Sequence, residues 1–596
     1  MMLNNAKLAT LLLCSFLLSA CGGSNNSSST GNGPEIPPSV RNADILVFYA
    51  ICCEGQAASD RKAQLYKFNV KGETIQLSDP NQTESVDSTE VSPDKERVAY
   101  SYYLDNDKLG LKILKIDSTE QEFSAPPFAG DRVQEITWRP DSQSLIYLPY
   151  IFDNRSGSLS LASISEDSPS ELIRNISDYT LSGDGTLIAT LTTSYEAGQP
   201  VSAELNLLDL TGQLERTLLE TTTGSANQYN LGWSPYANDL LYQARSIDSD
   251  AYFTPADEPA GPLMLRDADG HILPILDANP NYPSEVLPFL GMATRQYRWI
   301  DEQRILLNSS GAPSFLVVAR DGSIIVEQEI SYGSLIAASP DQRHLAFINY
   351  DQGDRDKPQV YIMNIDTGDV QAVGRGSVLW LDNSVFDSSI LRWSEDGSML
   401  AWNSGISYDK RSRGELYVHN LETSITQLIT SDFVHVESQI EPYYQSVFRD
   451  QEGNFSWLPG ENLLEYVTDS GAGLKLALTD PIANKTQVVG QMAASVDTPC
   501  QYARIWRTKE EVVWNHCGDS VYHSLINTQG EVTNTKILDG DMFSTQLTDN
   551  REYVAIRSGL AGAIGHWYMF DFVADKLLKV EIPEGAAQPF RIELLQ

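Results

Sequence analysis

One pattern of apolar and polar positions recurs along the chain. An apolar residue or Trp precedes a Ser-Pro-Asp-like turn, three or four polar residues follow, and an apolar and aromatic run comes next. The pattern reads Val91-Ser92-Pro93-Asp94 before Val98-Ala99-Tyr100, and it returns as Ser339-Pro340-Asp341 before Leu345-Ala346-Phe347. Repetition of one unit at intervals of about 40 to 50 residues indicates a propeller or another array of structural repeats.

Ten such turns can be placed along the sequence. Their anchor residues are Ser92, Arg139, Ser182, Ser234, Ile300, Ser339, Ser394, Leu458, Arg507 and Thr548. Short apolar runs and runs with period-two alternation, such as residues 111–117, lie between Gly, Asp, Asn and Pro clusters, which is typical of antiparallel strands. Three to four strands per unit predict the blades of a β-propeller. The turns at Ile300 and Arg507 lack the Pro or the Gly and are less typical.

The repeated phrase resembles the WD-repeat-like blade motif of TolB-type propellers, which also occurs in the propellers of prolyl oligopeptidases and tricorn-type proteases. The resemblance covers essentially residues 44–582 and implies an all-β fold. We interpret the repeated Asp and Trp positions as scaffold, because Asp hydrogen-bonds the local backbone of a turn and Trp fills the space between neighbouring blades. Strand-like sequence starts directly at Asp44, so we expect no α/β domain of the TolB kind before the blades and transfer none of TolB's partners.

We expect about ten to eleven four-stranded blades. Apolar runs at 45–48 and 65–68 precede the first anchor, and residues 590–595 are a candidate strand that closes a ring. Two tandem rings are predicted, with residues 43–285 in the first and 286–596 in the second, and the best boundary is at 279–283. The alternative is one large ring.

The first 20 residues predict a signal peptide. Lys7 precedes an apolar run at 8–18, which is too short for a membrane span. The run ends in Leu18-Ser19-Ala20-Cys21, which resembles the lipobox of bacterial lipoproteins; the alternative is an ordinary signal peptide that happens to end in Cys. The resemblance implies a lipid bilayer as partner through acylated Cys21, and Gly22 after it implies the outer membrane. Residues 21–42 are rich in Gly, Ser and Asn and predict a flexible tether of about 25 Å root-mean-square length.

The net charge of the chain limits the classes of partner that it can bind. The chain has 80 Asp and Glu against 42 Lys and Arg, a net charge of −38. A surface of this sign repels polyanions, so we expect no nucleic-acid binding.

Cys500 and Cys517 flank two strand-like runs joined by a polar turn and are a disulfide candidate in an oxidising compartment. Cys52 and Cys53 are adjacent, and they either bridge each other or stay free.

The sequence contains no constellation to which we assign chemistry. Gly-x-Ser-x-Gly, His-Glu-x-x-His and phosphate-loop motifs are absent, so no catalytic residue, metal ligand or cofactor is predicted. For the Asp-rich stretches at 105–107 and 267–270, hairpin turns are favoured over calcium loops. Separate structural roles are favoured over a shared metal site for the five histidines His419, His435, His516, His523 and His566.

These observations favour a non-catalytic scaffold that binds envelope proteins or peptides. The alternative is a propeller enzyme acting on glycans, whose acid and base carboxylates would come from different blades. Sequence spacing cannot select that pair.

Overall fold

The computed structural model consists of β-strands and their connections. It describes residues 44–51, 62–78, 84–104, 108–152, 156–196, 199–221, 226–247, 263–276, 297–307, 314–330, 336–350, 358–376, 391–404, 412–435, 455–469, 471, 473–493, 504–516, 520–559, 566–581 and 591–594. These described residues include no helix that could cross a membrane. The expectation of an all-β fold is confirmed.

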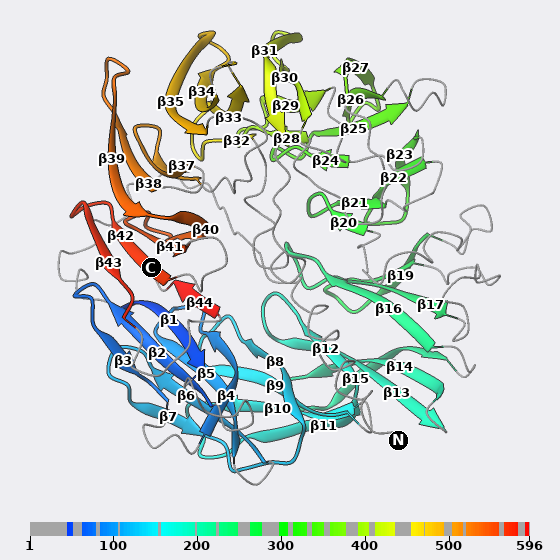
Figure 1. Ribbon diagram of the computed structural model, residues 1–596. Helices are drawn as coiled ribbons and strands as arrows, with labels where there is room; N and C mark the ends of the chain where they lie inside the picture. Colours follow the sequence, from blue (N-terminus) through cyan, green and yellow to red (C-terminus); the bar gives the residue numbers. More distant parts are fainter. Residues whose placement is uncertain are drawn as a thin grey trace, which may run out of the picture.

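The strands form four-stranded antiparallel units, which we call blades and list from the innermost to the outermost strand (Figure 1). Blade 1 contains β44 (Arg591–Leu594), β1 (Asp44–Ile51), β2 (Ala63–Asn69) and β3 (Thr74–Gln76). Blade 2 contains β4 (Glu84–Val91), β5 (Arg97–Leu104), β6 (Leu109–Lys115) and β7 (Gln121–Ser124). Blade 3 contains β8 (Arg132–Trp138), β9 (Ser144–Ile151), β10 (Ser156–Ser163) and β11 (Ser170–Ile176). Blade 4 contains β12 (Asp178–Leu181), β13 (Leu187–Glu196), β14 (Gln199–Asp209) and β15 (Leu214–Thr221).

Four further blades continue the series in chain order. Blade 5 contains β16 (Ala226–Trp233), β17 (Leu240–Ile247), β18 (Leu263–Arg266) and β19 (Ile272–Leu276). Blade 6 contains β20 (Tyr297–Trp299), β21 (Arg304–Leu307), β22 (Ser314–Ala319) and β23 (Ile324–Glu329). Blade 7 contains β24 (Ile336–Ala338), β25 (His344–Tyr350), β26 (Pro358–Asn364) and β27 (Val370–Arg375). Blade 8 contains β28 (Leu391–Trp393), β29 (Met399–Ser404), β30 (Ser412–Asn420) and β31 (Ile425–His435).

Three blades complete the fold. Blade 9 contains β32 (Phe455–Trp457), β33 (Leu464–Asp469), β34 (Leu474–Asp480) and β35 (Lys485–Ala493). Blade 10 contains β36 (Arg504–Thr508), β37 (Glu511–His516), β38 (Ser520–Ile526) and β39 (Val532–Asp539). Blade 11 contains β40 (Asp541–Leu547), β41 (Tyr553–Gly559), β42 (His566–Asp571) and β43 (Lys576–Lys579). A single residue pair, Phe433 with Thr468, links blades 8 and 9 into one eight-stranded sheet.

Hydrophobic clusters fasten each blade to the next. Val47 of blade 1 packs in one cluster with Val98 and Tyr100 of blade 2, and the same arrangement recurs from blade to blade. The series returns to its start, because Phe48 of blade 1 also shares a cluster with Trp567 of blade 11. Burial of these apolar side chains between blades is the main favourable contribution to the assembly.

The last strand of the chain belongs to the first blade. Leu46, Val47, Phe48 and Tyr49 of β1 pair with Leu594, Glu593, Ile592 and Arg591 of β44. The expected closing strand at the carboxyl end is therefore confirmed. Figure 1 shows the blades in succession around a circle. From this pairing and the continuous series of clusters we infer a single ring of eleven blades, the alternative to the two tandem rings that we predicted from anchor spacing; the predicted boundary at 279–283 lies outside the described residues.

The two faces of the blades carry different connections. Connections from the first to the second strand, and from the third to the fourth, span only two to six residues and lie on one face, which we call the turn face. The strand ends that are joined by the second-to-third and blade-to-blade connections lie at the opposite face, which we call the loop face. The connections themselves, many of them outside the described residues, range in length from one residue to the twenty residues of 277–296. The short turns therefore define one uniform face, and variation in length is confined to the other.

Candidate functional site

The repeated Asp residues fix turns on the turn face. In blade 8 the Ser394 hydroxyl donates to Asp396 Oδ1 at 2.7 Å, and the amide of Ser398 donates to the same oxygen at 2.9 Å. Burial raises the pKa of Asp396, but hydrogen bonds from Asn462, Ser394 and Ser398 outweigh burial and lower this pKa to about 2. The carboxylate is thus held ionised by turn contacts, as expected for scaffold.

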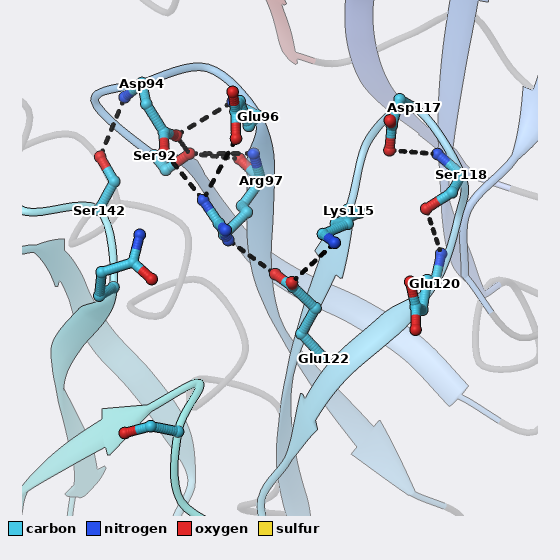
Figure 2. A network of polar contacts seen from close by, with 12 residues as sticks. Ser92, Asp94, Glu96, Arg97, Lys115, Asp117, Ser118, Glu120, Glu122 and Ser142 are labelled. Atoms are coloured by element: carbon cyan, nitrogen blue, oxygen red, sulfur yellow. Dashed lines mark hydrogen bonds and ion pairs between the residues drawn. The ribbon is translucent and has the colours of Figure 1, made fainter.

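Figure 2 shows the equivalent turn in blade 2. Ser92 Oγ donates to the Asp94 carboxylate, and the Arg97 guanidinium donates to Asp94 at 2.8 Å and to Glu122 at 2.7 Å. The amide of Asp94 donates to Ser142 Oγ in the turn of blade 3 at 3.0 Å. The charged groups of this network are used to fix one turn and join it to its neighbour.

The Trp residues before the anchors also hold neighbouring blades together. The Nε1–H groups of Trp138, Trp393 and Trp457 donate to backbone carbonyls on the innermost strand of the preceding blade, at 2.9–3.0 Å. A single residue thus combines an apolar ring in the interface with a directional hydrogen bond to the preceding blade. The interpretation of the repeated Trp as scaffold is confirmed.

The Asp-rich turn between β18 and β19 is a hairpin turn of a repeated type. Asp267, Asp269 and His271 place their ligand atoms within 4.8 Å of one another. However, His271 bonds Asp267 across the turn at 3.2 Å, as Glu73 bonds Asn69 at 2.9 Å in the corresponding turn of blade 1. The turn of blade 1 makes the same kind of contact without a second acidic residue. The contact between His271 and Asp267 is therefore explained by the turn and does not by itself indicate a metal site. The other stretch, 105–107, lies outside the described residues.

The histidines of the second half lie in separate environments. The His523 ring in β38 is buried between two carboxylates, with Nε2 2.9 Å from Glu511 Oε1 and Nδ1 3.1 Å from Asp575 Oδ1. His419 in β30 lies 3.0 Å from the Thr426 hydroxyl, and burial lowers its pKa. His566 is exposed at the start of β42. The side chains of His435 and His516 lie outside the described residues, as do both Asp105 and Asp107.

Three carboxylates have no role in the repeated turns described above. Asp87 in β4, Glu135 in β8 and Asp178 in β12 lie on the innermost strands of blades 2, 3 and 4, and we call them the inner-wall carboxylates. A β-bulge interrupts the pairing of β4 at Asp87 and that of β8 at Glu135. Bulges redirect side chains and are over-represented beside functional sites. We therefore take the inner-wall carboxylates as the candidate site.

Two of these residues occupy the same position in consecutive blades. Glu135 and Asp178 each lie four residues before the anchor of their blade, whereas blades 5 and 11 carry Asn230 and Ser544 there. An acidic residue is therefore no requirement of the repeat at this position. Aligning the inner strands on their anchors would have revealed the pair from sequence alone.

Burial disfavours the ionised forms of both Glu135 and Asp178. Burial raises the pKa of Glu135, and the charge of Asp178 raises it further, against a hydrogen bond from Thr137. Burial also raises the pKa of Asp178, against a hydrogen bond from the amide of Tyr179 at 2.9 Å. Solvent reaches both side chains, but the surrounding protein excludes part of their hydration. Two such carboxylates are suited to receive a cationic group or to exchange a proton.

Tyr179, the residue after Asp178, joins blade 4 to blade 3. Its side chain is buried, and its hydroxyl lies 2.8 Å from Thr137 Oγ1 and donates to the Ile146 carbonyl at 3.3 Å. Burial raises the pKa of Tyr179 well above its usual value, and the charge of Glu135 adds to this. The phenol therefore stays neutral and holds blade 4 against blade 3.

Asp87 extends the site into blade 2. Burial raises its pKa, against a backbone amide of β8 and the positive charge of Arg132. The Tyr103 hydroxyl donates a hydrogen bond to the Asp131 carbonyl at 2.7 Å. Burial and the charge of Asp87 raise the pKa of Tyr103, so its hydroxyl stays protonated. Arg132 is the cation near Asp87, so the three inner-wall carboxylates together outnumber it.

The cysteines to which the sequence assigns a role cannot be compared with this site. Cys21, Cys52, Cys53, Cys500 and Cys517 fall outside the described residues. Acylation of Cys21 and a disulfide between Cys500 and Cys517 therefore stay predictions.

Comparison with known proteins adds no family. No family model matches the sequence, and no curated protein matches it. An oligogalacturonate lyase in complex with manganese is 11% identical at a TM-score of 0.28, and the match covers 74% of this chain and 99% of that one. TolB from Acinetobacter baumannii is 13% identical at a TM-score of 0.23, with 61% and 81% covered.

The β-propeller domain of the Trilobed protease from Pyrococcus furiosus is similar to a comparable extent. It is 10% identical at a TM-score of 0.27, with 56% of this chain and 94% of that chain covered. Similarities at these TM-scores bear on no activity, and the propeller fold follows from the sheet topology of the chain itself.

Proposed function

We propose that this protein is a non-catalytic β-propeller scaffold, anchored by lipid in a bacterial envelope, that binds protein or peptide partners. The observation that supports it is the contrast between the two faces. Hydrogen bonds among short turns fix the turn face, whereas connections of one to twenty residues are confined to the loop face. Rigid frameworks that concentrate variable connections on one face are typical of binding proteins.

The inner-wall carboxylates supply the chemistry of recognition. The charge of Asp178 raises the pKa of Glu135, so a Lys or Arg side chain from a partner that binds between the two carboxylates would relieve this unfavourable interaction. Charge-assisted hydrogen bonds of this kind are stronger than neutral ones. The net charge of −38 also attracts basic partners and speeds their association at low salt.

Photo-crosslinking in envelopes tests this function. A benzophenone amino acid at position 88, four residues before the anchor Ser92 on the neighbouring innermost strand, should capture a partner in the wild-type background and lose most of it when Glu135→Gln and Asp178→Asn are added. The same label at position 321, in the turn before β23 on the turn face, is the matched control and should capture less. Equal capture from both positions would contradict binding at the inner wall. No capture at either position, together with glycan degradation by the purified protein, would reject the scaffold.

The acidic pair also favours a second candidate function, hydrolysis or elimination on a glycan. Such enzymes need one carboxyl group protonated as acid and another ionised as base or nucleophile, about 5 to 10 Å apart. The raised pKa of Glu135 would suit the acid role. Release of reducing ends from envelope polysaccharides, lost by more than about 100-fold in Glu135→Gln, would establish this candidate in place of the scaffold.

A further inference from the structure

The exposed large aliphatic side chains follow the repeat. Nine of them, from eight blades, lie at the first or second residue of an outermost strand, or in the short turn just before it. They are Ile75, Leu214, Leu273, Ile324, Ile325, Val370, Ile425, Ile482 and Val573. We call this set the aliphatic rim.

The rim is confined to the perimeter of one face. Ile482 is 69% exposed in the turn before β35, and Ile425 is 62% exposed at the first residue of β31. Both positions adjoin connections of the turn face. Single exposed aliphatic residues are ordinary on protein surfaces. Recurrence within the same short region, around the start of the outermost strand, in eight of the eleven blades is a different observation and calls for a common explanation.

The chain enters the ring on this same face. Asp44, the first residue of β1, pairs with Asn69, from which the turn between β2 and β3 begins. The 43 preceding residues of the sequence therefore join the ring on the turn face. β1 is the second strand from the inside, so this attachment lies well within the perimeter marked by the rim.

Charge decides which surface the rim can meet. Acidic residues such as Asp209, Asp321 and Asp480 recur in the turns beside the rim. Anionic lipid would repel them, whereas a bilayer with zwitterionic headgroups imposes no such penalty. Transfer of aliphatic side chains from water into the boundary between headgroups and acyl chains is favourable.

We propose that the turn face lies on the bilayer, with the aliphatic rim in contact with zwitterionic headgroups, so that the loop face and the inner-wall carboxylates point away from the membrane. This orientation rests on the lipid anchor of the proposed function. A tether of roughly 20 residues has a root-mean-square length of about 25 Å, so the ring stays near the membrane long enough for weak rim contacts to matter.

Lipid-borne nitroxides test the orientation directly. The acylated full-length protein is placed on liposomes of phosphatidylcholine and phosphatidylethanolamine, with a fluorescent amino acid at position 482 or at position 152. Phe152 is 47% exposed at the loop-face end of β9 and is the matched site. Position 482 should be quenched at least threefold more than position 152. Equal or reversed quenching would overturn the proposal.

Flotation of the Cys21→Ser form separates the rim from the anchor. The combined variant Ile324→Ser, Ile425→Ser and Ile482→Ser should bind these liposomes about fivefold less, whereas Leu428→Ser with Val488→Ser should stay within twofold. Leu428 and Val488 are also about half exposed but lie farther along the outermost strands. Unchanged binding of the rim variant would reject the rim, as would a rim-dependent dimer in solution. Equal flotation of the acylated protein and of the Cys21→Ser form would reject the anchor alone, whereas no flotation of the acylated wild type would reject both.

Discussion

Glu135 of β8 and Asp178 of β12 occupy equivalent positions on consecutive innermost strands, and the charge of Asp178 helps to raise the pKa of Glu135. Neither carboxylate belongs to the repeated turn that fixes the scaffold. The pair therefore places a destabilising charge on the inner wall, in contrast to turn carboxylates such as Asp321 and Asp396, whose pKa values are lowered by hydrogen bonds. Functional sites commonly retain such local costs.

Asp178→Asn should stabilise the protein at neutral pH. The folded-state pKa of Asp178 lies above its ordinary value of 3.8, so the native state binds a proton more tightly than the unfolded state. Stability is then lost as pH rises from about 3.8 through the raised pKa, and the loss persists above it. Asn keeps the acceptor for the Tyr179 amide and removes the charge. Urea unfolding should show a higher midpoint for the variant at pH 7 and no difference near pH 3.

Asp321→Asn is the control for which we expect the opposite change in stability. Hydrogen bonds from Ser323 lower the pKa of Asp321, so its ionised form stabilises the folded state above the ordinary pKa of 3.8. This variant should lower the midpoint at pH 7. Equal shifts in both variants would show that loss of charge as such, rather than local environment, determines the result.

Trp138→Phe should destabilise the ring more than Trp299→Phe. Both rings are 7% exposed, so the two substitutions remove similar apolar area. Trp138 Nε1 donates to the Glu90 carbonyl at 3.0 Å, whereas Trp299 Nε1 has no hydrogen-bond partner among the described residues. The difference between the two free energies of unfolding should be about 1 kcal/mol. Equal losses would show that packing alone accounts for the role of these Trp residues.

The repeated phrase predicted the propeller because each part of it has a local cause. Asp396 accepts the Ser398 amide within its own turn, so its role can be recognised in a short stretch of sequence. Trp138 contacts Glu90 of the preceding blade, and its role is recognised from its recurrence before the turns. The turn at Arg507 was placed slightly early: β36 continues to Thr508, and the tight turn that follows spans only 509–510. A two-residue turn leaves no room for the usual phrase.

Ring number and the inner-wall site depend on geometry that no single repeat contains. Anchor spacing measures the length of a blade and not the angle between blades, so it could not separate one ring from two. The strand at 591–594 was a better indicator, since a terminal strand needs a partner and β1 supplies it. Glu135 and Asp178 were missed because comparison began at the turns and did not extend to the strands before them.

Asp396→Ala should weaken the junction between blades 8 and 9. The substitution removes the acceptor of the Ser398 amide and of Asn462 Nδ2, which lies 3.0 Å away in the turn of blade 9. A loss of about 1 kcal/mol in the free energy of unfolding is expected at pH 7. Because the pKa of Asp396 is about 2, this loss should shrink as pH falls from 3.8 towards 2.

A double-mutant cycle isolates the contact between the two blades. Asn462→Ala alone removes the donor, and the coupling of the two substitutions should be about 0.5 kcal/mol, as for other hydrogen-bonded pairs in one network. Zero coupling would assign the whole effect of Asp396→Ala to the turn of blade 8.

Removal of residues 591–596 should open the ring at blade 1. Four residue pairs between β44 and β1 would be lost, and the edge of β1 at Leu46 and Phe48, both buried here, would be exposed. At about 1 kcal/mol for each net hydrogen bond, the free energy of unfolding should fall by roughly 2–4 kcal/mol. Exposed strand edges pair with other chains, so the truncated protein should also associate in light scattering.

A peptide of residues 587–596 should reverse both effects when it is added to the truncated protein, because it can refill the vacant edge by strand addition. A peptide of the same composition in scrambled order is the control, and removal of 595–596 alone should leave the urea midpoint near that of the full chain. If the truncated protein keeps the wild-type midpoint and stays monomeric, β44 contributes nothing to closure. The eleven blades would then be held in succession by their interblade clusters alone.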